Sequence, residues 1–240
     1  MNKRLMDNGI FVLLCLLICT DLAFAGLHIL HIYTDILPRS LYSIEQDKGY
    51  AEFFQYTKQA WIILLLGIAF LKKSTLTNFS WFMVFCYVLF DDALSIHEHL
   101  GLLASSAMAF AAQLGLRAQD WGELAVAGLA GIILLTPIAL AYPYAHREEK
   151  LHTLKLAGLL GLLVFFGICT DMLHIVLGGD LWGLIEDGGE MIVISLTVYY
   201  LFRHGFEYLA VAQPMAVNAL EPRQEGTSAD LQPVRLAPPL

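Results

Sequence analysis

The chain has 240 residues, of which 58% are hydrophobic and 15% are charged, a balance typical of membrane proteins rather than of soluble domains. Its formal net charge is −8 and it has no basic patch, which excludes nucleic acid as a binding partner. The lipid bilayer is therefore the expected environment of the chain.

A helix needs about 20 apolar residues to cross a bilayer, so the hydropathy pattern predicts an all-α polytopic protein with six transmembrane helices. In chain order, the expected spans are residues 10–33, 51–71, 81–103, 121–142, 154–177 and 181–202. They form one predicted domain, residues 1–212. Because residues 213–240 are polar and rich in proline, we expect them to form a disordered cytoplasmic tail.

The first span also resembles a secretory signal peptide. Lys3 and Arg4 precede the apolar run, and residues 23–25, Ala-Phe-Ala, have the pattern of a cleavage site. The run nevertheless contains Asp21 and continues through Leu30, which makes it long enough to cross the membrane. We expect this segment to be retained as the first helix.

Basic residues determine the predicted orientation, because cytoplasmic loops carry an excess of lysine and arginine. One side of the predicted topology has Lys3, Arg4, Lys72, Lys73, Arg147, Lys150, Lys155 and Arg203, whereas the other has Arg39, Lys48 and Arg117. Both termini are therefore predicted to be cytoplasmic, in a bacterial inner membrane.

Carboxylates and imidazoles interrupt the spans, where ionisable groups are costly and usually mark a functional site. They fall in the middle or outer half of each span. The cytoplasmic halves are almost entirely apolar, and these stretches are residues 11–19, 62–71, 81–90, 132–140, 156–169 and 192–202. This asymmetry predicts a chamber that opens toward the periplasm and is closed on the cytoplasmic side by apolar packing.

Helical geometry places many of these polar side chains on shared faces. In the third span the shared face carries Asp91, Asp92, Ser95, Glu98 and His99, whereas His97 points elsewhere. The other stripes are Asp21 with His28, Glu52 with Gln55, Tyr56 and Gln59, Asp171 with His174, and Glu186 with Asp187 and Glu190. Lys58 lies off the stripe of the second span. We expect these stripes to meet in one chamber.

A short repeat agrees with this arrangement. Residues 18–21, Ile-Cys-Thr-Asp, recur as residues 168–171, and a histidine follows each copy. Asp92 and His99 have the same spacing as Asp21 and His28. The pattern is that of three helical hairpins repeated in parallel, although a four-residue match in apolar sequence also arises by chance.

So many carboxylates cannot ionise together in a low dielectric without compensation. Carboxylate and imidazole together suit a divalent metal, with zinc as the first choice and manganese or iron as alternatives. The expected ligands are Asp21, His28, Asp92, His99, Asp171 and His174. The expected catalytic or supporting groups are Ser95, Glu98, Glu186, Asp187 and Glu190.

Three functional hypotheses remain open from these residues. The first is metal-assisted hydrolysis or modification of a lipid-like substrate or another small molecule. The second is proton- or cation-coupled transport, in which the carboxylates bind ions. The third is a non-catalytic accessory subunit, whose acid–histidine pairs hydrogen-bond neighbouring helices together.

Three stretches carry a resemblance to known proteins. Residues 49–56 (GYAEFFQY), 90–101 (FDDALSIHEHLG) and 185–191 (IEDGGEM) resemble segments of uncharacterised bacterial multi-pass inner-membrane proteins of unknown function. The chain is also loosely similar to alkaline-ceramidase-like transmembrane hydrolases, which place Ser, Asp and His around zinc. In that comparison Ser95, Asp91, Asp92 and His99 match the residue types, and the resemblance implies zinc-dependent hydrolysis.

Overall fold

The computed structural model describes residues 3–107 and 112–220 of the chain. The chain divides into two compact units, residues 1–205 and 206–240. In the described residues, regular structure is helical and contains no named strand, which confirms the predicted all-α class. Of the second unit, the structure describes residues 206–220 as helix.

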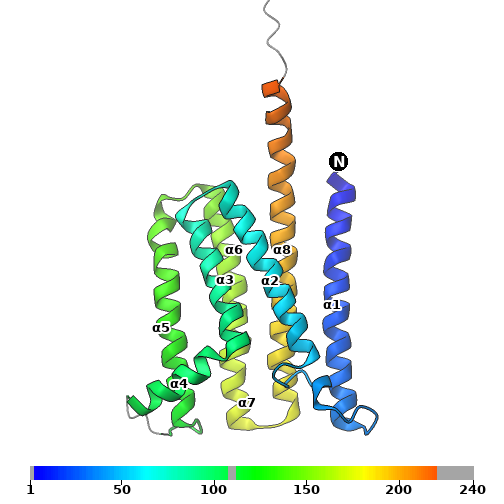
Figure 1. Ribbon diagram of the computed structural model, residues 1–240, viewed down its shortest axis with the longest axis vertical. Coiled ribbons are helices and arrows are strands. Elements are labelled where there is room, and N and C mark those ends of the chain that lie inside the picture. The colour runs from blue at the N-terminus through cyan, green and yellow to red at the C-terminus, as the bar shows by residue number, and fades with distance from the viewer. Residues whose placement is uncertain (1–2, 108–111, 221–240) are drawn as a thin grey trace, which may run out of the picture. The chain divides into compact units, whose positions relative to one another are not determined.

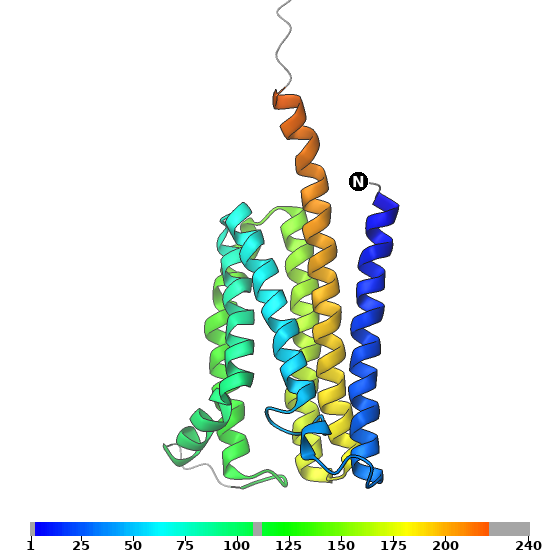
Figure 2. The same cartoon turned by 45° about the vertical axis from the view of Figure 1, so that its right-hand side comes forward.

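The first unit is built from antiparallel helices (Figure 1). In chain order the elements are α1 (Lys3–Tyr33), the 3-10 turn η1 (Ser40–Tyr42), α2 (Tyr50–Lys72), α3 (Leu76–Leu94), α4 (Ile96–Ala107), α5 (Ala118–Ala141), the 3-10 turn η2 (Tyr142–Tyr144), α6 (Arg147–Val164), the π-helical turn η3 (Phe165–Thr170), α7 (Asp171–Leu177) and α8 (Asp180–Leu220). Helices α1, α3 and α6 descend in Figure 1, whereas α2, α5 and α8 ascend (Figure 2). We call the end that carries α4 and α7 the lower end.

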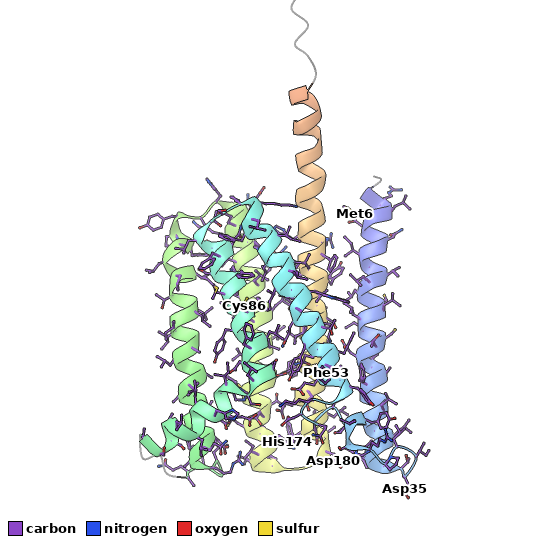
Figure 3. The ribbon with its side chains drawn as sticks, in the orientation of Figure 1. Met6, Asp35, Phe53, Cys86, His174 and Asp180 are labelled. Carbon is purple, nitrogen blue, oxygen red and sulfur yellow. The ribbon has the colours of Figure 1, made fainter. Side chains whose placement is uncertain are left out.

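The lower end is also the end that carries the polar side chains of the predicted chamber. Figure 3 shows His174 and Asp180 there, whereas Met6 lies at the opposite end of α1. The connection between α1 and α2, residues 34–49, turns back at the same end. Topology alone therefore brings the outer parts of the predicted spans together.

Several helices have the length and composition to cross a membrane. Four segments qualify among the described residues, namely Arg4–Tyr33, Tyr50–Lys72, Ala118–Tyr144 and Arg147–Leu177. The pair α3 and α4 makes a fifth if it is counted as one bent span. Helix α8 is not among the described segments that qualify, and its first turns carry Asp180, Glu186, Asp187 and Glu190.

The predicted third span, residues 81–103, is wrong as a single helix. Helix α3 ends at Leu94, and α4 leaves it at an angle of 79°. Between them Ser95 adopts a left-handed backbone with φ 47° and ψ 46°, and its N–H donates to the carbonyl oxygens of Asp91 and Asp92. A left-handed residue interrupts the helical period, so side chains after Ser95 do not continue the face predicted from a straight helix.

The upper part of the first unit is an apolar core. Its main buried cluster comprises Leu17, Ile62, Leu66, Trp81, Val84, Phe85, Ile138, Leu156, Ile194, Val198 and Leu201. Every member falls in one of the apolar half-spans that the sequence predicts to pack against one another. The sequence pattern thus correctly separated an apolar half of the unit from a polar half.

One predicted segment ends differently from the expectation, and another lies where it was expected. Helix α8 continues to Leu220, past the predicted start of a disordered tail at Gln213, and residues 221–240 lie outside the described residues. The predicted first span lies within one continuous helix, α1. Its retention in the mature protein stays a prediction.

Candidate functional site: an acidic chamber

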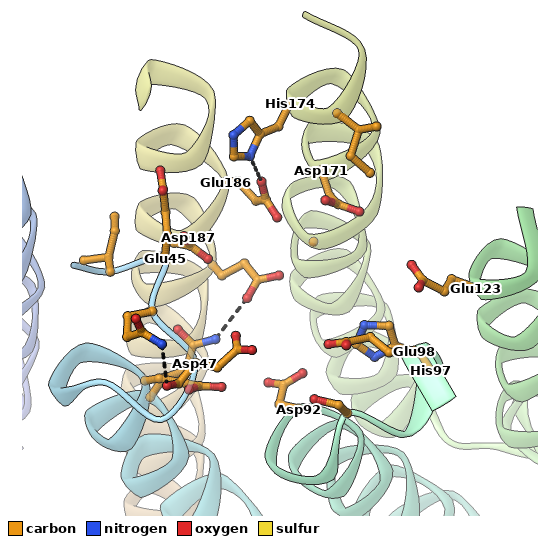
Figure 4. Close-up of a pocket in the computed structure, with 18 of the residues that line it drawn as sticks. Glu45, Asp47, Asp92, His97, Glu98, Glu123, Asp171, His174, Glu186 and Asp187 are labelled. Atoms are coloured by element: carbon orange, nitrogen blue, oxygen red, sulfur yellow. Dashed lines mark hydrogen bonds and ion pairs between the residues drawn. The ribbon is translucent and has the colours of Figure 1, made fainter. Parts of the chain in front are cut away.

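A cavity of about 620 Å³ lies at the lower end of the first unit, and Figure 4 shows the side chains around it. Its carboxylates are Glu45, Asp47, Glu52, Asp92, Glu98, Glu123, Asp171, Glu186, Asp187 and Glu190. Arginine and histidine contribute three lining residues, Arg117, His97 and His174. We call this cavity the acidic chamber, because its acids greatly outnumber its bases.

Arg117 does little to offset that excess, because a nearby carboxylate already holds its guanidinium. Its Nη2 lies 2.7 Å from Oδ1 of Asp120, and its Nε donates to the same oxygen at 3.0 Å. This hydrogen bond raises the pKa of Arg117 above its ordinary value, so the side chain stays charged and paired. The chamber therefore keeps its acidic character.

One wall of the chamber combines a histidine with two carboxylates. Nδ1 of His174 on α7 lies 3.1 Å from Oε2 of Glu186 on α8. Asp171 precedes His174 by three residues on α7, so both lie on the same side of that helix (Figure 4). The contact with Glu186 orients the imidazole ring and directs its Nε2 away from that carboxylate.

Two further carboxylates are held by glutamines of α2. Nε2 of Gln59 donates to Oδ2 of Asp92 at 2.5 Å, and Nε2 of Gln55 donates to Oε2 of Glu190 at 3.0 Å. Both glutamines are buried and lie one helical turn apart. The predicted polar stripe of the second span thus supports the chamber by fixing acids from α3 and α8.

A glycine in the π-helical turn η3, Gly167, allows its helix to approach Glu190 closely. A Cβ atom on Gly167, within this turn, would lie 2.1 Å from Oε1 of Glu190. Gly189 has a similar constraint, because its Cβ would lie 2.2 Å from the ring of Phe166. Such π-helical turns often occur at functional sites, and here the turn faces the acids of α8.

The chamber is lined by His97 and not by His99, the histidine expected from the third span. His97 lines the chamber and pairs with Asp91, its Nδ1 lying 3.2 Å from Oδ2. His99, an expected metal ligand, is exposed, and its Nδ1 contacts the carbonyl oxygen of Ser95 at 2.7 Å. The left-handed bend at Ser95 explains the exchange, because it rotates α4 relative to α3.

Asp21 was expected to line the chamber, but it lies outside the chamber because it forms a buried ion pair. Oδ1 of Asp21 lies 2.7 Å from Nζ of Lys58, and Oδ2 accepts from Oγ of Ser195 at 2.5 Å. Lys58 also donates to Ser195 and to the carbonyl oxygen of Met191. Lys58, predicted to lie off the polar stripe, is thus 0% exposed at the junction of α1, α2 and α8.

His28 likewise lies outside the chamber lining. Its Nδ1 is 3.1 Å from Oγ of Ser43 and accepts from the backbone N–H of Ile44 at 3.4 Å. Its Nε2 lies 3.9 Å from Glu45, which does line the chamber. His28 therefore anchors the connection after α1, and like Asp21 it does not line the chamber that was expected to hold both.

The other predicted residues do meet. Three expected metal ligands line the chamber, namely Asp92, Asp171 and His174, together with all of Ser95, Glu98, Glu186, Asp187 and Glu190. The acids Glu45, Asp47 and Glu123 also line it. The sequence did not predict them as site residues, because they lie in the connection between α1 and α2 or near the start of α5. An acid at such a position is ordinarily solvated.

The chamber lining supplies oxygen and nitrogen donors, but in the described part of the chain no three His, Cys, Asp or Glu residues form a group that could hold a metal ion. His174 and Glu186 are one contacting pair of such donors in the lining, with 3.1 Å between Nδ1 and Oε2. Binding a metal would thus require the flexible carboxylates to change rotamer.

A family model described as a domain of unknown function (DUF8692) matches residues 9–204. The chain belongs to this family. No curated protein and no solved structure matches the chain. Every residue that lines the acidic chamber falls within the matched region, as does the ion pair of Lys58 and Asp21.

Proposed function

We propose that the protein is an integral membrane enzyme that binds a divalent metal ion in the acidic chamber and hydrolyses or modifies a lipid-like substrate there. The observation that carries the proposal is the large excess of carboxylates around one cavity, with two imidazoles among them. A bound divalent cation would offset their mutual repulsion, and it would also activate water for hydrolysis.

The wall made by α7 and α8 has the donors that zinc prefers. Asp171, His174 and Glu186 would supply oxygen and nitrogen ligands, with manganese or iron as alternatives. Asp92 and Glu190 would then serve as general base or as supporting acids, since the glutamines of α2 already orient them. The metal ligands proposed here do not include Asp21, His28 and His99.

We further infer that the protein crosses a bacterial inner membrane six times, with both termini in the cytoplasm. Helices α3 and α4 would count as one bent crossing, and α8 would be the last. The distribution of lysine and arginine supports this orientation. Helix α8 can cross because its early carboxylates line the chamber instead of facing lipid. In this orientation the chamber opens toward the periplasm.

Zinc binding by variants of purified protein tests the metal site. We expect His174→Ala to weaken zinc affinity by roughly tenfold to a hundredfold, measured by competition with a chelator in detergent solution. His99→Ala is the matched control, because His99 is exposed and outside the chamber, and it should keep the wild-type affinity. Equal affinity of the two variants, or absence of zinc, manganese and iron binding in the wild type, would contradict the proposal.

Cation- or proton-coupled transport is the second candidate function. The buried ion pair of Lys58 and Asp21 favours it, since ionisable pairs inside membrane helices often form ion or proton pathways. Asp92→Asn should then abolish cation- or pH-driven flux into proteoliposomes, while Asp35→Asn, at an exposed position outside the chamber lining, should retain most of it. Flux that persists in Asp92→Asn, or that is absent from the wild type, would count against transport.

A further inference from the structure

A second cavity of about 240 Å³ lies between α3, α5 and α6, within the membrane-spanning part of these helices. Its apolar lining includes Val84, Val88, Leu124, Leu134, Leu160 and Leu163. It shares six lining residues with the acidic chamber, namely Asp92, His97, Glu123, Gly167, Asp171 and Glu190. The two cavities are therefore neighbours that meet at the acids of α3 and α8.

We propose that the two cavities form one binding site for a single-chain amphiphile with a cationic, amine-bearing head group. The head group would lie in the acidic chamber beside Asp92 and Glu190, and the hydrocarbon chain would lie in the apolar cavity. The proposal rests on the proposed function, because it names the class of substrate for the same site.

Charge complementarity selects the head group. The chamber has many carboxylates, and its one arginine is paired with Asp120. An anionic head group would be repelled there, whereas an ammonium group would gain charge-assisted hydrogen bonds. Together the two cavities reach the size range of typical small-molecule sites, and their polar and apolar parts are segregated as in an amphiphile.

The apolar cavity also reaches the lipid-facing surface of the helices. Leu135 on α5 and Val164 on α6 both line it, and they are 38% and 45% exposed. A hydrocarbon chain could thus enter from the bilayer between α5 and α6 while its head group stays at the lower end. This path requires no movement of the buried apolar core.

Gly131 offers a way to close the apolar cavity without straining the backbone. It lines the cavity, and a Cβ atom added to it would meet no other atom within 4 Å. Gly131→Leu should therefore fill the cavity. Gly128→Leu is the matched control on the same helix, because an added Cβ there also meets nothing within 4 Å and the residue does not line the cavity.

Photolabelling in phosphatidylcholine nanodiscs tests the proposal. The probe is dodecylammonium, whose head group has N–H donors, with a diazirine near the end of its chain, and dodecyl sulfate with the same diazirine is the anionic counterpart. We expect the cationic probe to label peptides of α3, α5 and α6 that line the apolar cavity. Gly131→Leu should remove this labelling, Gly128→Leu should retain it, and Glu190→Gln together with Asp92→Asn should lower it several-fold.

Two results would overturn the proposal. One is labelling spread evenly over lipid-facing segments and unchanged by Gly131→Leu, and the other is equal labelling by the anionic probe. Zinc affinity measured on the same preparations shows whether the amphiphile proposal alone fails or the proposed metal site fails as well. Gly131→Leu should bind zinc as the wild type does, so loss of labelling with intact zinc binding supports the amphiphile site specifically.

Discussion

Lys58→Met is expected to destabilise the protein by about 3–5 kcal/mol, because it leaves the carboxylate of Asp21 buried without its cation. Lys58 is 0% exposed and Asp21 is 3% exposed, so water cannot replace the lost partner. Ser195 would still donate one hydrogen bond to Asp21, which does not neutralise its charge. The free energy of unfolding, measured by steric trapping in detergent micelles or bicelles, checks this prediction.

A second substitution separates the loss of charge pairing from a simple loss of packing. Adding Asp21→Asn to Lys58→Met removes the unpaired charge, so the double variant should recover most of the lost stability. Lys72→Met is the matched control, since Lys72 lies in the exposed last turn of the same helix. Additive losses in the double variant would show that the ion pair is not the source of the effect.

Gly122→Ala is expected to cost about 3 kcal/mol of stability, because it places an atom in the contact between α4 and α5. A Cβ on Gly122 would lie 2.0 Å from the carbonyl oxygen of Gly101 and 2.8 Å from its carbonyl carbon. Both contacts are with backbone, so no side chain can rotate to relieve them. The free energy of unfolding and zinc affinity should fall together, since α4 and α5 carry His97 and Glu123 to the chamber wall.

Gly128→Ala provides the comparison on the same helix. An added Cβ there meets nothing within 4 Å, so stability should change little or rise slightly through the helix preference of alanine. If Gly122→Ala behaved like Gly128→Ala, the close approach of α4 and α5 would not shape the chamber.

Hydropathy and polarity predicted the coarse organisation of this protein well. The helical class and the separation of apolar and polar halves follow from the cost of exposing apolar surface to water or charge to lipid. Asp171, His174, Glu186 and Glu190 were correctly assigned to one chamber, because each lies on a regular helix whose faces are predictable.

The errors arose where regular helical geometry fails or where a charge finds a partner. Because of the bend at Ser95, His97 lines the chamber in place of the predicted His99. Nothing in the local residues marks Ser95 as left-handed. Asp21 was assigned to the chamber because its partner, Lys58, comes from another helix. Helical periodicity describes one helix at a time, so it could not anticipate a pairing between two. The six crossings and the internal repeat stay predictions.

Consecutive turns of α2 present nitrogen donors to carboxylates on three different helices. Gln55 holds Glu190, Lys58 holds Asp21, and Gln59 holds Asp92. A rotation of α2 about its own axis would therefore displace acids of α1, α3 and α8 at the same time. Anything that twists this one helix, whether a bound molecule or a change in bilayer thickness, would shift Asp92 and Glu190 in the acidic chamber together with Asp21 outside it, in a single concerted step.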